Sequence, residues 1–448
     1  MKRNLIFSKN KKYLNLKEPS LFIGNWCLEG VSKEKLSELD YQTCDSFSFK
    51  KEERIKNYAY CETIFLSIIN DLKDNLNQLH NVNFSTRSWE IIIGVWLRRF
   101  IYIVFNRLEH LKNALNNHQI DKIYLLETTD YKLFTKDTAG FESASIDEEW
   151  NHVLYSEIFK FIKSDQTIIY DKTLNKFIKS QETFTELNKK SLKMKFAHSI
   201  IKIFKAFKRN KDALIYESGL RFLQEKKLEI LLSQVPQLWY PPPIGFKSFD
   251  PSMRAKIDLK YNNYKDCEKI VRYLIPNSMP VSALESFEDI NSLQKKMGFP
   301  KKPKLIFTSN AFNHDEIFKL YAANKVDEGT PYITGQHGSS YFTLIDNDYV
   351  TEYNTCSKFI SWGSLSKSKT KSAFNFKVID RKKLFDKDGY LTVMCRSLGY
   401  RQVPYDRHKE KILGIKSTVN LLEKLPPQIR KKTILRLHSS YLDRGKHL

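Results

Sequence analysis

Cysteine is scarce in this sequence, and no pair of cysteines has metal-binding spacing. The six cysteines are scattered over the chain without a C-x-x-C pair, at positions 27, 44, 61, 267, 356 and 395. This spacing argues against a zinc site and against a disulfide framework. We therefore expect no structural metal, and the cysteine usage fits a reducing cytoplasm.

Long apolar runs are also missing. The N-terminus, MKRNLIFSKNKKY, returns to polar residues after a few apolar ones, which is not the pattern of a signal peptide. The most apolar window, Trp89 to Phe105, is interrupted by Arg98 and Arg99 and is short for a bilayer span. The sequence predicts a cytoplasmic protein, with peripheral contact at the inner membrane surface as a further expectation.

Several familiar catalytic motifs do not occur. The chain has no Walker loop, no G-x-G-x-x-G, no H-E-x-x-H and no G-x-S-x-G. These absences weaken the case for a P-loop nucleotidase, a dehydrogenase with the usual dinucleotide fingerprint and a serine hydrolase of the usual type.

Acidic residues are outnumbered by basic ones. Lysine and arginine total 74 against 51 aspartates and glutamates, a formal net charge of +23. The basic residues are spread from end to end without a dense run, so a nucleic-acid partner is not favoured. The excess is either a set of solvated lysines or the mark of an anionic partner, such as a phosphorylated substrate or a membrane face.

What is present is an α/β pattern. The 448 residues suffice for two or three domains. Short apolar runs predict strands at 5–7, 21–23, 123–126, 213–216, 305–308, 331–334, 359–362, 390–395 and 433–437. Helical periodicity predicts helices at 52–79, 89–115, 284–297 and 410–424. The helix at 89–115 is apolar on most sides, so we expect it to be central and buried.

The stretch from Lys304 to Gly363 organises the chain. It shows a strand, a crossover helix and a second strand, and this second strand is followed by the turn Gly335-Gln336-His337-Gly338. Such a unit makes parallel strands, and ligands bind outside the carboxyl ends of parallel strands. His337 titrates near neutrality and can act as a base or as a cation toward phosphate. The alternative is a histidine that only hydrogen-bonds a backbone carbonyl.

Polar residues at the head of the crossover helix allow two interpretations. Asn313 as an N-cap, followed by an acidic first turn, is ordinary helix chemistry. The other interpretation is a site that faces the same edge as His337, with Glu316 or Asp315 as its carboxylate.

Three arginines follow the predicted strands near the C-terminus. Arg396 and Arg401 lie in CRSLGYR, and Arg436 occupies the equivalent end of a later strand. Guanidinium groups there could hold a diphosphate, and surface solvation is the alternative.

A composition shift divides the chain. Residues 364–387 are rich in Ser, Lys and Asn without periodicity, so we expect a linker there. The predicted architecture is a Rossmann-like parallel-sheet domain with inserted helices at 1–363 and a partial second α/β domain at 388–448. One strand-helix-strand unit is too small to bury a sheet on both faces, so we expect this second domain to be incomplete.

Five segments together resemble a family of bacterial surface-polysaccharide (O-antigen-type) transferases. In chain order they read LFIGNWCL, SWEIIIGVWLRRFIYIVFNR, SNAF, GQHGSSYF and KFISWG. The family resembles two-domain nucleotide-sugar transferases of the GT-B-like kind. The resemblance implies transfer of a sugar from a nucleotide-sugar, used as co-substrate without a further cofactor, to a glycan or lipid-linked acceptor.

The resemblance also implies roles for particular residues. His337 would act as base or as a cation at the leaving phosphate, with Glu316 as a carboxylate. Substrate binding would fall to Gly335, Gln336, Gly338, Asn310 and Trp26. Arg396, Arg401 and Arg436 would face the donor diphosphate. Two alternatives stay open: a polyol-phosphate transferase of related fold, and a truncated non-catalytic relative that binds a glycan, a membrane or a partner transferase.

Overall fold

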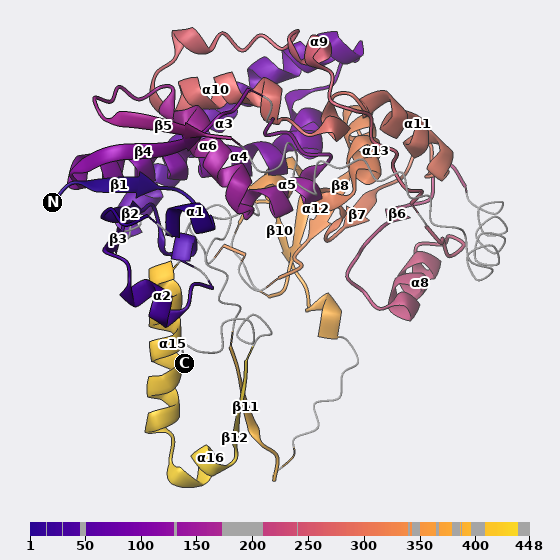
Figure 1. Cartoon of the computed structure of the whole chain (residues 1–448). Coiled ribbons are helices and arrows are strands. Elements are labelled where there is room, and N and C mark those ends of the chain that lie inside the picture. Colours follow the sequence, from indigo (N-terminus) through magenta and orange to yellow (C-terminus); the bar gives the residue numbers. More distant parts are fainter. Residues whose placement is uncertain are drawn as a thin grey trace, which may run out of the picture.

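The chain is an α/β protein with two parallel sheets of five strands each (Figure 1). The structure is a computed structural model, and it describes residues 1–14, 16–28, 30–44, 51–129, 132–172, 209–239, 241–338, 341–342, 350–363, 367–378, 386, 388–395 and 408–437. Every neighbouring pair of strands in the two sheets is parallel. The predicted fold class, α/β with Rossmann-like sheets in a GT-B-like arrangement, is confirmed.

The first sheet has the order β3-β2-β1-β4-β5. Its strands are β1 (Arg3–Ile6), β2 (Ser20–Phe22), β3 (Tyr41–Thr43), β4 (Ile120–Leu126) and β5 (Thr167–Asp171). Its helical segments are α1 (Lys11–Leu14), η1 (Asn25–Leu28), α2 (Lys33–Ser37), α3 (Lys51–His80), α4 (Thr86–Asn117), α5 (Thr138–Ser145) and α6 (Glu148–Phe159). The chain builds outward from β1 in both directions, so the strand order reverses between β1 and β4.

The second sheet has the order β10-β9-β8-β7-β6. Its strands are β6 (Leu214–Ile215), β7 (Ile306–Thr308), β8 (Tyr332–Gly335), β9 (Lys358–Ser361) and β10 (Thr370–Ser372). Helical segments between and after them are α8 (Phe222–Leu231), α9 (Pro251–Arg254), η3 (Tyr261–Asn263), α10 (Asp266–Ser278), η4 (Val281–Ala283), α11 (Phe287–Met297), α12 (Ala311–His314), α13 (Glu316–Asp327), α14 (Val350–Thr355) and η5 (Phe376–Val378). The sheet therefore grows one strand at a time in a single direction.

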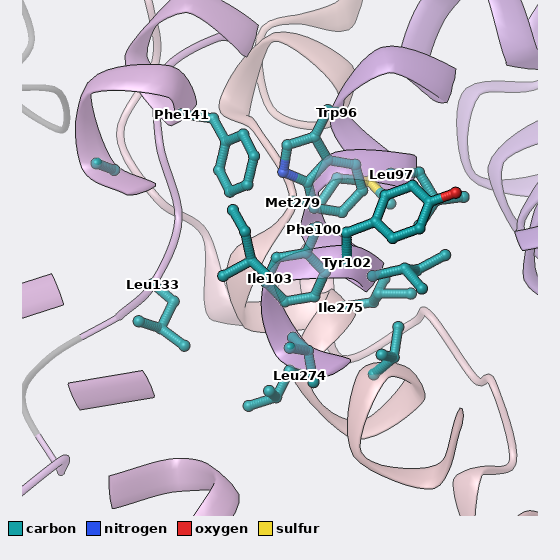
Figure 2. Close-up of a cluster of buried hydrophobic side chains, with 14 of the residues drawn as sticks. Trp96, Leu97, Phe100, Tyr102, Ile103, Leu133, Phe141, Leu274, Ile275 and Met279 are labelled. Atoms are coloured by element: carbon teal, nitrogen blue, oxygen red, sulfur yellow. The ribbon is translucent and has the colours of Figure 1, made fainter. Parts of the chain in front are cut away.

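Helix α4 is the central, buried helix that its composition predicted. Ser85 precedes it, and the Ser85 hydroxyl accepts the backbone N–H of Ser88, a standard N-cap contact. Figure 2 shows Trp96 and Phe100 of α4 beside Phe141 of α5, in a cluster that also takes in side chains of α10. The rings of Trp96 and Phe100 stack with centroids 5.4 Å apart. The helix is apolar on several faces because it packs against several elements at once.

The same helix joins the two sheets. The Ser88 hydroxyl donates to the Ala323 carbonyl of α13 over 2.9 Å, and Arg98 donates to the Thr351 hydroxyl of α14 over 2.7 Å. Gly94 lies at this contact, where an added Cβ would come within 3.2 Å of the Thr351 methyl. The apolar surface of α4 is therefore shared between helices of both halves.

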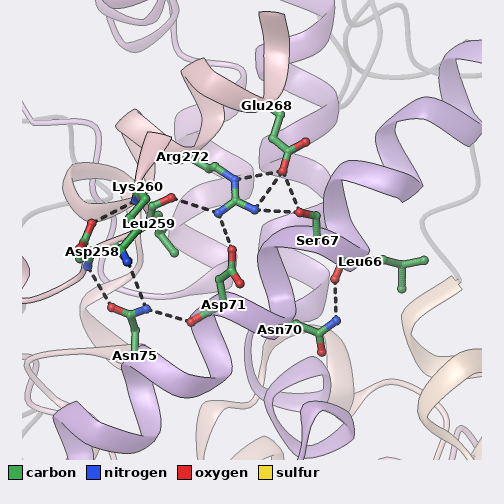
Figure 3. A network of polar contacts seen from close by, with 10 residues as sticks. All are labelled: Leu66, Ser67, Asn70, Asp71, Asn75, Asp258, Leu259, Lys260, Glu268 and Arg272. Atoms are coloured by element: carbon green, nitrogen blue, oxygen red, sulfur yellow. Dashed lines mark hydrogen bonds and ion pairs between the residues drawn. The ribbon is translucent and has the colours of Figure 1, made fainter. Parts of the chain in front are cut away.

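A polar network ties α3 to α10 (Figure 3). The Arg272 guanidinium is fully buried and donates to Asp71 over 2.6 Å and to the Ser67 hydroxyl over 2.8 Å. It also pairs with Glu268, one turn earlier on its own helix, and lies over the Tyr264 ring. A buried guanidinium is tolerated here because its donors are used by these partners.

The remaining described strands form a parallel pair, β11 (Leu391–Met394) and β12 (Thr433–Arg436). Helices α15 (His408–Lys424) and α16 (Pro427–Lys431) lie between them in sequence. Both five-stranded sheets lie before residue 373, and β10 falls inside the range 364–387 expected as a linker. The domain boundaries at 363 and 388 stay a prediction. Within the described residues, no helix is long and apolar enough to cross a membrane.

Candidate functional site

Polar groups gather at the carboxyl edge of the second sheet. Because its strands are parallel, Glu217 after β6, Ser309 after β7 and His337 after β8 lie along one edge. The Ser309 backbone N–H and hydroxyl both donate to the Glu217 carbonyl, over 3.0 and 2.9 Å. The His337 ring hydrogen-bonds to the Ser309 backbone in turn. The glycine-flanked turn thus lies at the sheet edge where the sequence predicted it.

His337 is held in a half-buried position. Its Nδ1 lies 2.5 Å from the Tyr341 hydroxyl oxygen, and that hydroxyl donates its single proton to the Glu352 carboxylate over 2.7 Å. Burial lowers the pKa of His337 to about 4, and the charges of Lys377 and Arg99 act in the same direction. The ring is therefore neutral at physiological pH. A neutral ring has one nitrogen without a proton, and that nitrogen can take a proton from a substrate hydroxyl that replaces its present partner.

Gln336 braces the turn through its side-chain amide. Its Nε2 donates to the Gly338 carbonyl over 2.7 Å, and its Oε1 accepts the backbone N–H of Trp362 over 2.8 Å. Gly335 lies against the Phe376 ring, and an added Cβ would come within 2.9 Å of that ring. The Gln336 side chain thus joins the end of β8 to the residue that follows β9, and Gly335 leaves room for the Phe376 ring of η5.

The crossover between β7 and β8 differs in detail from the sequence prediction. Asn313 is not an N-cap, because it lies inside the short helix α12, and Asn310 precedes that helix without a side-chain cap. The N-cap of α13 is Asp315, whose carboxylate accepts the Phe318 N–H over 2.9 Å. The Tyr216 hydroxyl donates to the same carboxylate over 2.6 Å, and burial raises the pKa of Asp315.

Glu316 lies where the two halves of the molecule meet. Its carboxylate pairs with the Lys319 ammonium over 2.8 Å and accepts the backbone N–H of Thr138, at the start of α5, over 3.1 Å. Asp137 lies beside this pair, and burial followed by the charge of Glu316 raises the pKa of Asp137. In Figure 1, α5 and α12 lie between the two sheets. Thr138 lies in the segment that follows β4 and Glu316 in the segment that follows β7, so this contact joins chain segments that leave the carboxyl ends of strands in both sheets.

Two further residues predicted from the sequence, Trp26 and Arg436, lie at or after the ends of other strands than those that precede His337 and Glu316. Trp26 follows β2 in the first sheet, where its ring packs beside His110 with centroids 5.5 Å apart and covers Gly24. Arg436 ends β12 and is exposed. Arg396 and Arg401 lie outside the described residues, so their proposed role at a diphosphate stays a prediction.

A hollow of about 520 Å³ opens at the carboxyl edge of the first sheet. It lies where the strand order reverses between β1 and β4, the place where ligands bind in doubly wound sheets. Residues that follow β1, β4 and β5 and the start of α6 line it, namely Ser8, Lys9, Asn10, Lys12, Tyr13, Leu126, Asp147, Glu148, Glu149, His152, Asp171 and Lys172. A hollow of this size could hold one or two sugar rings.

Hydrogen-bonding groups in this hollow are fixed by their neighbours. The Tyr13 hydroxyl donates to Asp171 over 2.7 Å, and Lys12 pairs with the same carboxylate. Burial, then the hydrogen bond with Asp171, raises the pKa of Tyr13, so the phenol keeps its proton. The His152 ring lies 3.0 Å from the Tyr124 carbonyl. Carboxylates, ammonium groups and a phenol together suit a ligand with several hydroxyl groups.

This hollow was not predicted from the sequence. Its signal was weak but present, since Lys9 and Asn10 follow a predicted strand and Leu126 ends another. Strand β5 was not predicted, and without it Asp171 had no place at the sheet edge. Among the residues that the structure describes, no group of three or more His, Cys, Asp or Glu side chains is arranged to hold a metal ion.

Comparison with known proteins bears on the class of the whole chain. A family model described as LIC12162 family transferase matches residues 3–447. Neither the curated proteins nor the solved structures contain a match.

Proposed function

The chain belongs to the LIC12162 family of transferases, and we propose that it transfers a sugar from a nucleotide-sugar donor to a precursor of a cell-surface polysaccharide. The observation that carries the proposal is a pair of parallel sheets whose carboxyl-end segments are in contact, with a polar hollow at the edge of one sheet and a neutral histidine at the edge of the other. Two-substrate transfer needs two binding surfaces, and the presence of polar groups at both sheet edges supports the proposal.

In this proposal the acceptor glycan enters the hollow of the first sheet. Tyr13 and Asp171 form a preset hydrogen-bonded pair there, and Lys12 balances the carboxylate charge. Sugar hydroxyl groups both donate and accept, so a surface that mixes carboxylates with ammonium groups can satisfy them. The acceptor is a free glycan or a lipid-linked one.

The donor faces the second sheet. His337 takes the proton of the acceptor hydroxyl, the freed oxygen bonds to the anomeric carbon, and the bond from that carbon to the diphosphate breaks. The nucleoside diphosphate then leaves with the electron pair of the broken bond. The charges of Lys377 and Arg99 lower the pKa of His337, so both cations lie near its ring. In the proposal they stabilise the negative charge of the leaving diphosphate. Arg396, Arg401 and Arg436 are further candidates for contact with the diphosphate.

A donor panel read by thermal shift tests the proposal. A ligand that binds only the folded state at about 100 times its Kd stabilises the protein by about 2.7 kcal/mol. We expect nucleoside-diphosphate sugars to raise the melting temperature and CDP-linked polyols to leave it unchanged. A shift with CDP-polyols alone would indicate polyol-phosphate transfer, and no shift with any donor would indicate a non-catalytic relative.

Variants separate the two surfaces. Tyr13→Phe and Asp171→Asn should raise the KM for the acceptor and keep the thermal shift produced by the donor. If these variants instead abolish the donor shift and leave the acceptor KM unchanged, the hollow belongs to the donor and our assignment of the two sheets is wrong.

A further inference from the structure

Helix α8 has an apolar face toward solvent. It lies beside β6, the edge strand of the second sheet, on the side remote from the first sheet (Figure 1). Leu228 packs inward against the small core around Phe307. The opposite face exposes four large apolar side chains, by 62% for Phe222, 77% for Leu223, 60% for Ile230 and 72% for Leu231. A surface helix is ordinarily polar on its outer face, so this face indicates a partner.

The carboxylates of α8 do not reach this face. Glu229 is fully buried and accepts the Gln237 backbone N–H over 2.9 Å while pairing with Lys226 over 3.1 Å. Glu225 pairs with Lys226 as well and accepts the Ser218 hydroxyl over 2.6 Å. The exposed side chains of the helix are therefore apolar or cationic.

Cations surround the C-terminal end of the helix. The backbone N–H of Lys302 donates to Asn210 and that of Lys304 to Lys211, over 2.9 and 3.4 Å, which holds two basic segments side by side. The Lys304 ammonium donates to the Leu232 carbonyl just past the helix, over 2.6 Å. The exposed basic residues at this end and at the start of the helix are Arg209, Lys211, Arg221, Lys227, Lys301, Lys302 and Lys304.

We propose that the outer face of α8 and its basic rim dock the protein on the surface of an anionic lipid bilayer. Apolar side chains of an interfacial helix enter the boundary between headgroups and acyl chains, and neighbouring lysines and arginines bind the anionic headgroups. Both signals lie on one surface here, and the helix turns no carboxylate toward the lipid. This inference is independent of the chemistry at His337.

Vesicle binding by the full chain tests the inference. We expect the protein to sediment with vesicles of phosphatidylcholine and phosphatidylglycerol, and not with phosphatidylcholine alone, with binding that weakens as salt rises. Leu223→Ser with Leu231→Ser should lower vesicle affinity about tenfold or more, because less apolar surface is buried. Lys211→Glu with Lys302→Glu should lower it by a similar factor.

Matched substitutions elsewhere serve as controls. Leu66→Ser on α3, at a side chain that is 58% exposed, and Lys295→Glu on α11 should leave vesicle binding unchanged. The inference is overturned if the α8 variants bind vesicles as well as the unchanged chain does, or if neutral vesicles bind equally well. It is also overturned if the protein ignores vesicles and self-associates in sedimentation velocity through the same leucines, because the partner is then a second copy.

Discussion

The Glu316 carboxylate accepts the backbone N–H of Thr138 across 178 positions of sequence, over 3.1 Å. Thr138 is the first residue of α5 and Glu316 the first of α13, so one side chain caps a helix of the first half from the second half. The Lys319 ammonium, only 1% exposed, donates to both Glu316 and the Thr138 hydroxyl over 2.8 Å. This buried contact joins the segment after β4 to the segment after β7, and so links the two sheets.

Glu316→Ala should therefore destabilise the protein. The substitution leaves the Lys319 charge buried without its carboxylate, which costs about 3 kcal/mol of unfolding free energy. The measurement is urea denaturation. Glu328→Ala removes an exposed partner of Lys325 on the same helix and should cost less than about 1 kcal/mol. Equal losses of unfolding free energy from the two variants would show that the Glu316 contact does not stabilise the fold more than an exposed ion pair does.

Gly335→Ala should strain the end of β8. An added Cβ would lie 2.9 Å from the Phe376 ring and 3.1 Å from the Phe307 ring, so the rings must move at a cost of about 1–3 kcal/mol. Gly245→Ala, where no atom lies within 4 Å of the added Cβ, is the control. In a double-mutant cycle with Phe376→Leu, the combined loss should be smaller than the sum of the single losses. Additive losses would rule out the steric explanation.

Substitutions at Gln336 should lower the stability of the protein by graded amounts. Gln336→Ala removes the contacts to Gly338 and Trp362, with an expected loss of about 1–2 kcal/mol because the partly buried N–H of Trp362 is left without its acceptor. Gln336→Glu keeps an acceptor for Trp362 and loses the donor to Gly338, so its loss should fall between zero and that of the alanine variant. Thermal unfolding of the three proteins measures the series. A glutamate variant less stable than the alanine variant would contradict it.

His337→Ala should abolish transfer with little change in melting temperature. General base catalysis contributes on the order of 10²-fold to 10⁴-fold in rate, and the half-buried ring leaves a small cavity. Steady-state kinetics and thermal unfolding of the same preparation check both parts. A large fall in melting temperature would instead assign His337 a structural role through Ser309 and Tyr341.

Stability should fall as pH falls from about 6.5 to about 4. Burial lowers the pKa of His80 and of His337 to about 4, against an ordinary value of 6.5, so the unfolded state binds more protons in that window. His80→Gln should therefore flatten the pH dependence of the unfolding free energy. His314 acts in the opposite direction, because its hydrogen bond to Glu217 raises the pKa of His314. His314→Gln should remove stability that is present at low pH and lost as pH rises past that raised pKa.

The elements predicted correctly were those whose pattern is local. Strands such as β4 and β7 are buried and nearly continuous in apolar residues, and α4 carries an apolar pattern over its first five turns, so sequence neighbours suffice to identify them. The missed strands, β3, β5 and β10, are short edge strands with partly exposed residues. Their pairing depends on a neighbouring strand that lies far away in sequence.

The features of the candidate site also fall into those that the sequence predicted and those that it did not. The placement of His337 at the end of a parallel strand followed from the strand, helix and strand around it, which lie within one short stretch of sequence. The sequence did not indicate that Gln336 braces Trp362, that Glu316 caps α5, or that Tyr13 meets Asp171 at a hollow. Each of these contacts joins groups that only the folded sheets bring within hydrogen-bond distance. Local apolar periodicity thus determined the elements and their parallel pairing, and the packing of distant segments alone decided which polar groups face one another.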